Sequence, residues 1–184
     1  MNKAIPNILA ALLALVSASP GMALDKEPPF ENISVEFELL DRAGKVVTEL
    51  DLRGRYVLLA FGFTRCAHIC PIMVANMALT LNVTDKKAMG VFISVDTERD
   101  TPAITHAYAS GFHESMVGLS GSHEQLRSAA NNFGISFVVS KSQKAYTVEH
   151  TSDIFLISPE GKLIDVFALN ASPLEIAQAM KHQP

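Results

Sequence analysis

An apolar run leads directly into the chain's only two cysteines, and this run limits the possible folds more than any other part of the sequence. Residues 56–63 are almost continuously apolar, which is the pattern of a strand buried on both faces. Pro71 suits the first turn of a helix, and residues 72–81 continue a helical pattern. Cys66 and Cys70 therefore lie at a strand-to-helix junction, four residues apart.

The rest of the chain alternates predicted strands and helices. Residues 35–40 and 46–50 flank a turn and predict an N-terminal β-hairpin. Residues 90–95 predict a second buried strand. Further helices are expected over residues 102–110, from Ser122 to just before Gly134, and from Ser172 onward, and further strands over residues 153–157 and 163–167. This order predicts an α/β sandwich with a central parallel pair of strands.

The N-terminus has the pattern of a secretory signal peptide over residues 1–23. A short positive start precedes an apolar stretch at residues 8–16, and small residues at 21 and 23 offer a cleavage site. An uncleaved hydrophobic anchor is the alternative, and under either interpretation the body of the protein is exported. We expect a flexible lead-in over residues 24–33 and a single domain over residues 34–184.

Composition narrows the class of protein. Removal of the signal peptide leaves roughly 160 residues, the length of one domain with an adequate core. Hydrophobic residues make up 48% of the chain and charged residues 18%, as in a globular protein. A net charge of −4 gives no reason to expect nucleic acid or an anionic membrane surface as a partner.

The cysteine pair is placed for chemistry rather than for a structural disulfide. Sites in open α/β sheets collect beyond the carboxyl ends of strands, where these cysteines fall. A loop this short removes little entropy from the unfolded chain, so a structural cross-link there would add little stability. The helix N-terminus is expected to favour a thiolate at Cys70 by lowering its pKa. A thiolate serves both disulfide exchange and the capture of a soft metal, and the pair alone does not decide between them.

Four further stretches of the sequence form recognisable motifs: Gly62-Phe-Thr-Arg-Cys66-Ala-His-Ile-Cys70-Pro71, Val95-Asp96-Thr97-Glu-Arg-Asp100-Thr-Pro102, Gly118-Leu-Ser-Gly121 and Tyr146-Thr-Val-Glu-His150-Thr. Through these motifs the sequence resembles the SCO/SenC family of exported, thioredoxin-fold copper chaperones linked to cytochrome oxidase assembly. The resemblance runs from about residue 37 to the C-terminal helix. It departs from the family pattern at Ala67, where proline is usual, and at His68, where a polar or acidic residue is commoner.

The resemblance implies a thioredoxin-like sandwich with a central mixed sheet flanked by helices. It also implies that copper, as Cu(I), Cu(II) or both, is bound by Cys66, Cys70 and His150. Thiolate sulfur is soft and suits Cu(I), and an added imidazole gives a set that also holds Cu(II). His150 is favoured because it precedes the strand at 153–157, which should place it facing the cysteines. The histidines interpreted as surface or otherwise non-ligand residues are His68, His106, His113, His123 and His182.

Other residues near the site have plainer interpretations. Met73 and Met77 lie one helical turn apart and are expected to fill the core. Asp100 or Thr101 is expected to cap the next helix, with Arg99 paired to a neighbouring carboxylate. For Asp96 two roles remain open, a structural one and one that tunes or docks beside the ligands.

Two functions are compatible with these residues. The first is a periplasmic or otherwise exported metallochaperone that delivers copper to the dinuclear copper centre of a terminal cytochrome oxidase. Its partners would be the copper-bearing oxidase subunit and other exported copper carriers or thiol reductases. The second is a thiol–disulfide oxidoreductase, with Cys66 and Cys70 as its catalytic pair. Three residues separate these cysteines, whereas thioredoxin-type enzymes use two, which favours the metallochaperone.

Overall fold

A five-stranded mixed sheet with the strand order β5-β4-β3-β8-β9 forms the centre of the protein. The computed structural model describes residue 30, residues 33–143 and residues 145–181. The expected signal peptide at residues 1–23 and most of the expected lead-in lie outside these residues. The strands of the sheet are β3 (Tyr56–Gly62), β4 (Ala88–Ser94), β5 (Met116–Leu119), β8 (Asp153–Ile157) and β9 (Leu163–Ala168). Strands β3, β4 and β5 run parallel, whereas β8 and β9 pair antiparallel, so the sheet is mixed as predicted.

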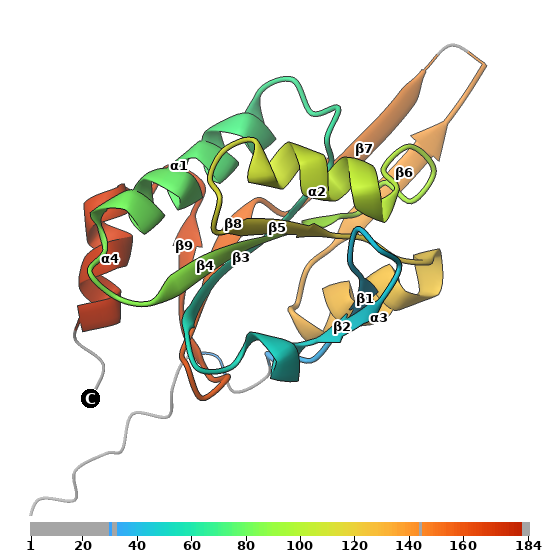
Figure 1. Ribbon diagram of the computed structural model, residues 1–184. Helices are drawn as coiled ribbons and strands as arrows, with labels where there is room; N and C mark the ends of the chain where they lie inside the picture. The colour runs from blue at the N-terminus through green and yellow to red at the C-terminus, as the bar shows by residue number, and fades with distance from the viewer. Residues whose placement is uncertain (1–29, 31–32, 144, 182–184) are drawn as a thin grey trace, which may run out of the picture.

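Both faces of the sheet are covered (Figure 1). One face carries α1 (Ile69–Val83), α2 (Pro102–Ser110) and α4 (Pro173–Lys181). The other face carries α3 (His123–Asn132) together with the hairpin of β1 (Glu38–Leu40) and β2 (Val46–Thr48). A short 3-10 helix, η1 (Glu49–Leu52), connects this hairpin to β3. The prediction of an α/β sandwich with an N-terminal hairpin is therefore confirmed.

Strand β3 explains why the sheet can be covered on both sides. Its side chains alternate between two cores, with Leu59 and Phe61 in one and Leu58 and Ala60 in the other. Each of these four side chains is fully buried, so the strand reads as a continuous apolar run. Aromatic rings reinforce the first core, where the ring centroids of Phe61 and Phe133 lie 5.4 Å apart.

The predicted starts of α2 and α3 are confirmed by their caps. Thr101, rather than Asp100, caps α2, since its side-chain oxygen accepts a hydrogen bond from the backbone N–H of Ile104. Ser122 and Gln125 form the expected capping box of α3. Met73 and Met77 are fully buried in the core beneath α1, as predicted.

A second hairpin projects from the body and was not predicted (Figure 1). It consists of β6 (Phe137–Lys141) and β7 (Tyr146–His150), which pair antiparallel as a sheet of their own. His150 therefore ends a strand instead of lying in a loop before β8. The hairpin carries His150 to the edge of the cysteine motif.

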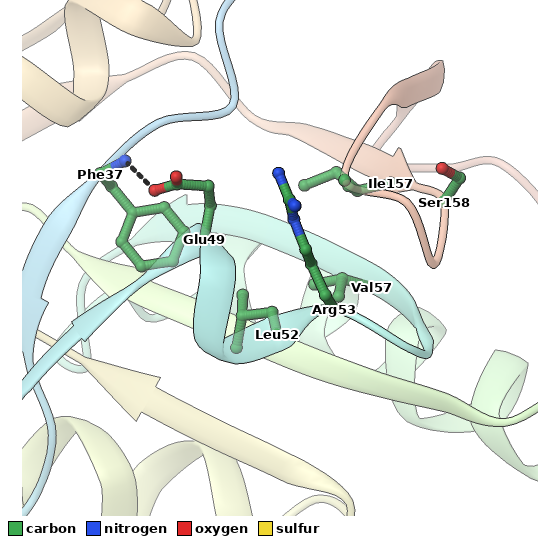
Figure 2. Close-up of a pocket in the computed structure, with 8 residues that line it drawn as sticks. Phe37, Glu49, Leu52, Arg53, Val57, Ile157 and Ser158 are labelled. Carbon is green, nitrogen blue, oxygen red and sulfur yellow. Dashed lines mark hydrogen bonds between the residues drawn. The ribbon is translucent and has the colours of Figure 1, made fainter.

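The end of the sheet opposite the cysteines holds a small hollow beside η1 (Figure 2). The hollow is lined by Phe37, Glu49, Leu52, Arg53, Val57, Ile157, Ser158 and Gly161. Its Glu49 carboxylate accepts a hydrogen bond of 3.4 Å from the backbone N–H of Phe37, so that acid already serves to hold the N-terminal segment. With neither cysteine nor histidine in its lining, this hollow does not compete with the cysteine motif as a functional site. Among the described residues, none of the helices combines the length and the apolar character needed to cross a bilayer.

Candidate metal centre

The two cysteines lie where β3 passes into α1, at the carboxyl end of the central strand. Cys70 is completely buried in the first turn of α1, whereas Cys66 is partly exposed in the preceding loop. Gly62, the last residue of β3, makes room for the buried sulfur. A Cβ atom at Gly62 would lie 2.6 Å from the Phe92 ring and 3.1 Å from Cys70 Sγ, so a side chain there would clash with the ring and crowd the sulfur.

His150 meets Cys70 directly. The Nε2 atom of His150 lies 3.4 Å from Cys70 Sγ. Its other ring nitrogen, Nδ1, lies 2.7 Å from the Thr151 carbonyl oxygen, which only accepts hydrogen bonds. Nδ1 therefore carries the proton, and the lone pair of Nε2 faces the sulfur. Burial lowers the pKa of His150, which keeps the imidazole neutral and able to bind a metal.

The two thiols differ strongly in acidity. Burial raises the pKa of Cys66, but hydrogen bonds from the Cys70 thiol and from the first backbone N–H groups of α1 outweigh it, so its pKa is lowered. Burial, and then the hydrogen bond to Cys66, raises the pKa of Cys70 to about 12. Cys66 is thus the thiol that ionises first.

The expectation that the helix N-terminus would lower the pKa of Cys70 is wrong. Helix α1 begins at Ile69, earlier than predicted, so Cys70 already lies within its first turn and points into the core. The free backbone donors instead face Cys66, whose Sγ accepts a hydrogen bond of 3.3 Å from the Cys70 N–H. The helix terminus therefore favours a thiolate at Cys66.

The structure brings Cys70 and His150 into contact and places Cys66 beside them. Within the part of the chain that the structure describes, no three or more His, Cys, Asp or Glu side chains are arranged to hold a metal ion as they stand. A site built from Cys66, Cys70 and His150 therefore needs a small movement in which Cys66 Sγ gives up the hydrogen bonds that it accepts from the backbone of α1. Cys66 borders an open cleft, which leaves space for that movement.

Of the other described histidines, only His68 lines the same cleft as Cys66. His68 is exposed at the start of α1 and its side chain caps no backbone group. His113 Nδ1 accepts a hydrogen bond from the Ser115 N–H, and His123 contacts Arg127 on α3. His106 lies partly exposed on α2, and His182 is outside the described residues. For His106, His113 and His123 these positions agree with the interpretation as non-ligand residues, whereas for His68 and His182 that interpretation stays a prediction.

Two buried aspartates that follow β4 form hydrogen bonds with residues around the cysteines and His150. Asp100 accepts hydrogen bonds from the Thr64 N–H at 2.7 Å, the Thr64 hydroxyl at 2.6 Å and the Ser94 hydroxyl at 2.6 Å. Asp96 forms the expected ion pair with Arg99 and accepts a hydrogen bond of 2.6 Å from the Tyr146 hydroxyl. Sequence reasoning missed the roles of Thr64 and Tyr146, because neither contact partner lies near them in the chain.

The fold and the paired cysteines define a thioredoxin-like protein, and the comparisons with known proteins specify which kind. The profile of the SCO1/SenC family matches residues 25–183. The chain belongs to this family. It is 34% identical to Protein sco1 of Schizosaccharomyces pombe over 152 residues, which cover 78% of this chain and 58% of the yeast protein. The chain thus spans less than two thirds of that relative's length.

Two solved structures show the same fold. The copper-bound structure of Arabidopsis thaliana ScoI has a TM-score of 0.76 at 31% identity, covering 82% of this chain and 99% of that one. The structure of BsSco has a TM-score of 0.61 at 25% identity, covering 83% of this chain and 96% of that one. BsSco is described as having a disulfide switch and as a member of the Sco family of cytochrome c oxidase assembly proteins.

Proposed function

We propose that this protein is an exported copper-binding metallochaperone that delivers copper to the dinuclear copper centre of a terminal cytochrome oxidase. The observation that carries the proposal is the contact between Cys70 Sγ and His150 Nε2. It joins a soft sulfur and a neutral imidazole whose lone pair is directed at the sulfur. Copper is the cargo that such a pair suits when a second thiolate, Cys66, completes it.

Each ligand has a distinct part in this proposal. Cys66, partly exposed and with a lowered pKa, makes the first contact with incoming copper as a thiolate. Cys70 must lose its proton to bind, so metal capture releases that proton to solvent. His150 supplies the nitrogen ligand that stabilises Cu(II). Three protein ligands leave a position open for a donor from the recipient, as transfer requires.

The relatives support the choice of metal and recipient. Arabidopsis ScoI has been solved with copper, and BsSco belongs to a family described as cytochrome c oxidase assembly proteins. The recipient proposed here, the copper-bearing oxidase subunit, extends that description to this chain. The signal-peptide pattern of residues 1–23 supports export, with the segment either cleaved or retained as an anchor.

The unequal thiols favour thiol–disulfide exchange as a second function. In such a reaction the Cys66 thiolate attacks a partner disulfide, forms a mixed disulfide and releases one partner thiolate. The Cys70 sulfur, after losing its proton, then attacks Cys66 Sγ, which forms the internal disulfide and releases the second partner thiolate. An exported thiol reductase would return the pair to the reduced state that binds copper.

Oxidase activity in cells carrying His150→Ala tests the proposal. Under copper delivery, activity falls in ordinary medium and is at least partly restored by added copper. Copper delivery through this site is overturned if cells with His150→Ala keep full oxidase activity while cells with Cys70→Ser lose it. Thiol exchange would then remain as the function.

A further inference from the structure

The β6–β7 hairpin positions His150, yet its backbone pairs with no strand of the central sheet in the described part of the chain. At its base, next to His150, a hydrogen bond of 3.1 Å joins the Thr151 N–H to the Ser136 carbonyl, and this bond closes the hairpin on itself. An isolated two-stranded hairpin is marginally stable in water. The direction of His150 therefore depends on contacts that tie the hairpin to the body.

One side of β7 faces the body along its whole length. Tyr146, Val148 and His150 are partly buried, whereas Thr147 and Glu149 between them are exposed. Because side chains alternate along a strand, Tyr146 and His150 share a face. A contact that fixes Tyr146 therefore fixes the direction in which His150 points.

Tyr146 is tied to a buried carboxylate. Its hydroxyl donates a hydrogen bond of 2.6 Å to Asp96 Oδ1, and Asp96 has no exposed surface. Burial and this hydrogen bond raise the pKa of Tyr146 to about 12, so the hydroxyl keeps the proton that it donates. Charge-assisted hydrogen bonds of this kind are among the stronger ones in proteins.

Arg99 completes the connection to the metal ligands. Its guanidinium pairs with Asp96 and lies 3.8 Å from the centre of the Tyr146 ring. The same guanidinium lies 6.0 Å from the Phe63 ring, and the Phe63 ring meets the His150 ring edge-on at 5.8 Å. Arg99 is thus packed between the loop that leads to the cysteines and the strand that carries the histidine.

We propose that Tyr146 and Arg99 are positioning residues that, through Asp96, hold β7 so that His150 Nε2 faces Cys70. The inference rests on the proposed role of His150 as a copper ligand. When the Tyr146–Asp96 hydrogen bond is absent, the inner face of β7 is no longer held against the body, and Nε2 loses its fixed direction toward the sulfur. Cu(II) binding then weakens while Cu(I), held by two thiolates, stays bound.

A second link joins the hairpin to the loop that carries Asp96 and Arg99, and this link is weaker. Lys141 on β6 pairs with Glu98, and both side chains are about half exposed, at 51% and 50%. Exposed ion pairs contribute little to stability. Lys141→Ala should therefore leave His150 in place, which separates a general tether of the hairpin from the specific contact at Tyr146.

The test compares Tyr146→Phe with Tyr108→Phe in the reduced full-length protein. Both variants lose one tyrosine hydroxyl, but the buried Tyr108 hydroxyl has no hydrogen-bond partner among the described residues. In the metal-free protein, Tyr146→Phe should speed amide hydrogen exchange over residues 137–150 roughly ten-fold, because one charge-assisted hydrogen bond is lost. With copper, it should weaken Cu(II) binding by a similar factor and reduce the charge-transfer absorption, with Cu(I) affinity changed less than about three-fold.

His150→Ala provides the reference that separates the two proposals. The positioning role is overturned if Tyr146→Phe keeps the hydrogen-exchange rates and the Cu(II) spectrum of the parent protein while His150→Ala loses Cu(II) binding. The proposed function would then stand. Unchanged Cu(II) binding in both variants would overturn the ligand role of His150, and the positioning role toward copper with it. Faster exchange of similar size in Tyr108→Phe would show that Tyr146 has no specific effect on the hairpin.

Discussion

Cys70 Sγ and His150 Nε2 lie 3.4 Å apart although 80 positions separate the two residues in the chain. The contact joins the first turn of α1 to the end of β7, two elements that belong to different parts of the fold. It gives the buried sulfur a nitrogen neighbour with a free lone pair.

His150→Ala should separate the two oxidation states of copper. Two thiolates suffice for a linear Cu(I) site, so Cu(I) affinity should fall less than about ten-fold, whereas Cu(II), which prefers nitrogen and higher coordination, should be lost much more severely. Competition titrations with Cu(I) and Cu(II) chelators measure both. Equal affinity of parent and variant for both ions would remove His150 from the site.

The two thiols should react with alkylating agents at different pH values. The pKa of Cys66 is lowered from its ordinary value of 9.0, so its thiolate and its alkylation rate should rise with a midpoint below pH 9.0. The pKa of Cys70, about 12, keeps that thiol protonated over the same range. Mass spectrometry of the metal-free reduced protein after short exposure to iodoacetamide should find the label on Cys66. Preferential labelling of Cys70 would contradict this order of acidity.

Asp100→Ala should be strongly destabilising. It removes the acceptor of three hydrogen bonds and leaves the Thr64 N–H and the Ser94 hydroxyl proton without an acceptor, at a cost of about 2–4 kcal/mol. Urea unfolding of the metal-free protein measures the loss. Asp85→Ala is the matched control, because Asp85 is exposed. Its ion pair with Lys181 is long, at 3.8 Å, and is worth less than about 1 kcal/mol. A similar loss for both variants would contradict a special role for Asp100.

Gly118→Ala should disrupt the contact between β5 and α2. A Cβ atom there would lie 2.1 Å from the Thr105 carbonyl oxygen, so strand and helix must move apart, at a cost of about 1–3 kcal/mol or more. Gly111→Ala is the control, since the nearest atoms to its added Cβ lie at 3.3 Å and its φ of −66° suits alanine. Equal melting temperatures for the two variants would contradict this, because they would show that β5 and α2 can move apart at Gly118 at little cost in stability.

Much of the fold was predictable because it depends on local sequence patterns. The continuous apolar run of β3, the proline that opens α2 and the capping box of α3 each depend on a few neighbouring residues. Strand β5 was missed because it is short, and its Gly118 is required by the approach of α2 rather than by the strand itself. Strands β6 and β7 were missed although Tyr146 to His150 alternate in polarity as a strand should.

The members of the candidate site were proposed from the sequence, whereas its electrostatics could not be predicted. Cys66, Cys70 and His150 were selected by motif, and the contact between Cys70 and His150 agrees with that choice. The acidity of the thiols was assigned to the wrong residue, because it depends on where α1 begins and on which sulfur points into the core. The link between Tyr146 and Asp96 spans 50 positions and has no local signal.

Oxidation of the cysteine pair should abolish copper binding at this site. The loop between Cys66 and Cys70 is short enough to bring the sulfurs together, and a disulfide offers no thiolate to a metal. The oxidised protein should bind at least about ten-fold less copper at the site than the reduced protein, and reduction should restore it. Equilibrium dialysis of both forms, with thiol counting, measures this. Undiminished binding by fully oxidised protein would place the copper elsewhere.

X-ray absorption of the reduced protein, loaded anaerobically with one equivalent of copper, reports the ligands of the metal itself. We expect one copper per chain, with two sulfur ligands from Cys66 and Cys70 and one nitrogen ligand from His150. The sulfur signal should be lost in the double variant Cys66→Ser and Cys70→Ser, and the nitrogen signal should be lost in His150→Ala. A copper environment without sulfur, or one that the double variant leaves unchanged at the same affinity, would contradict the account.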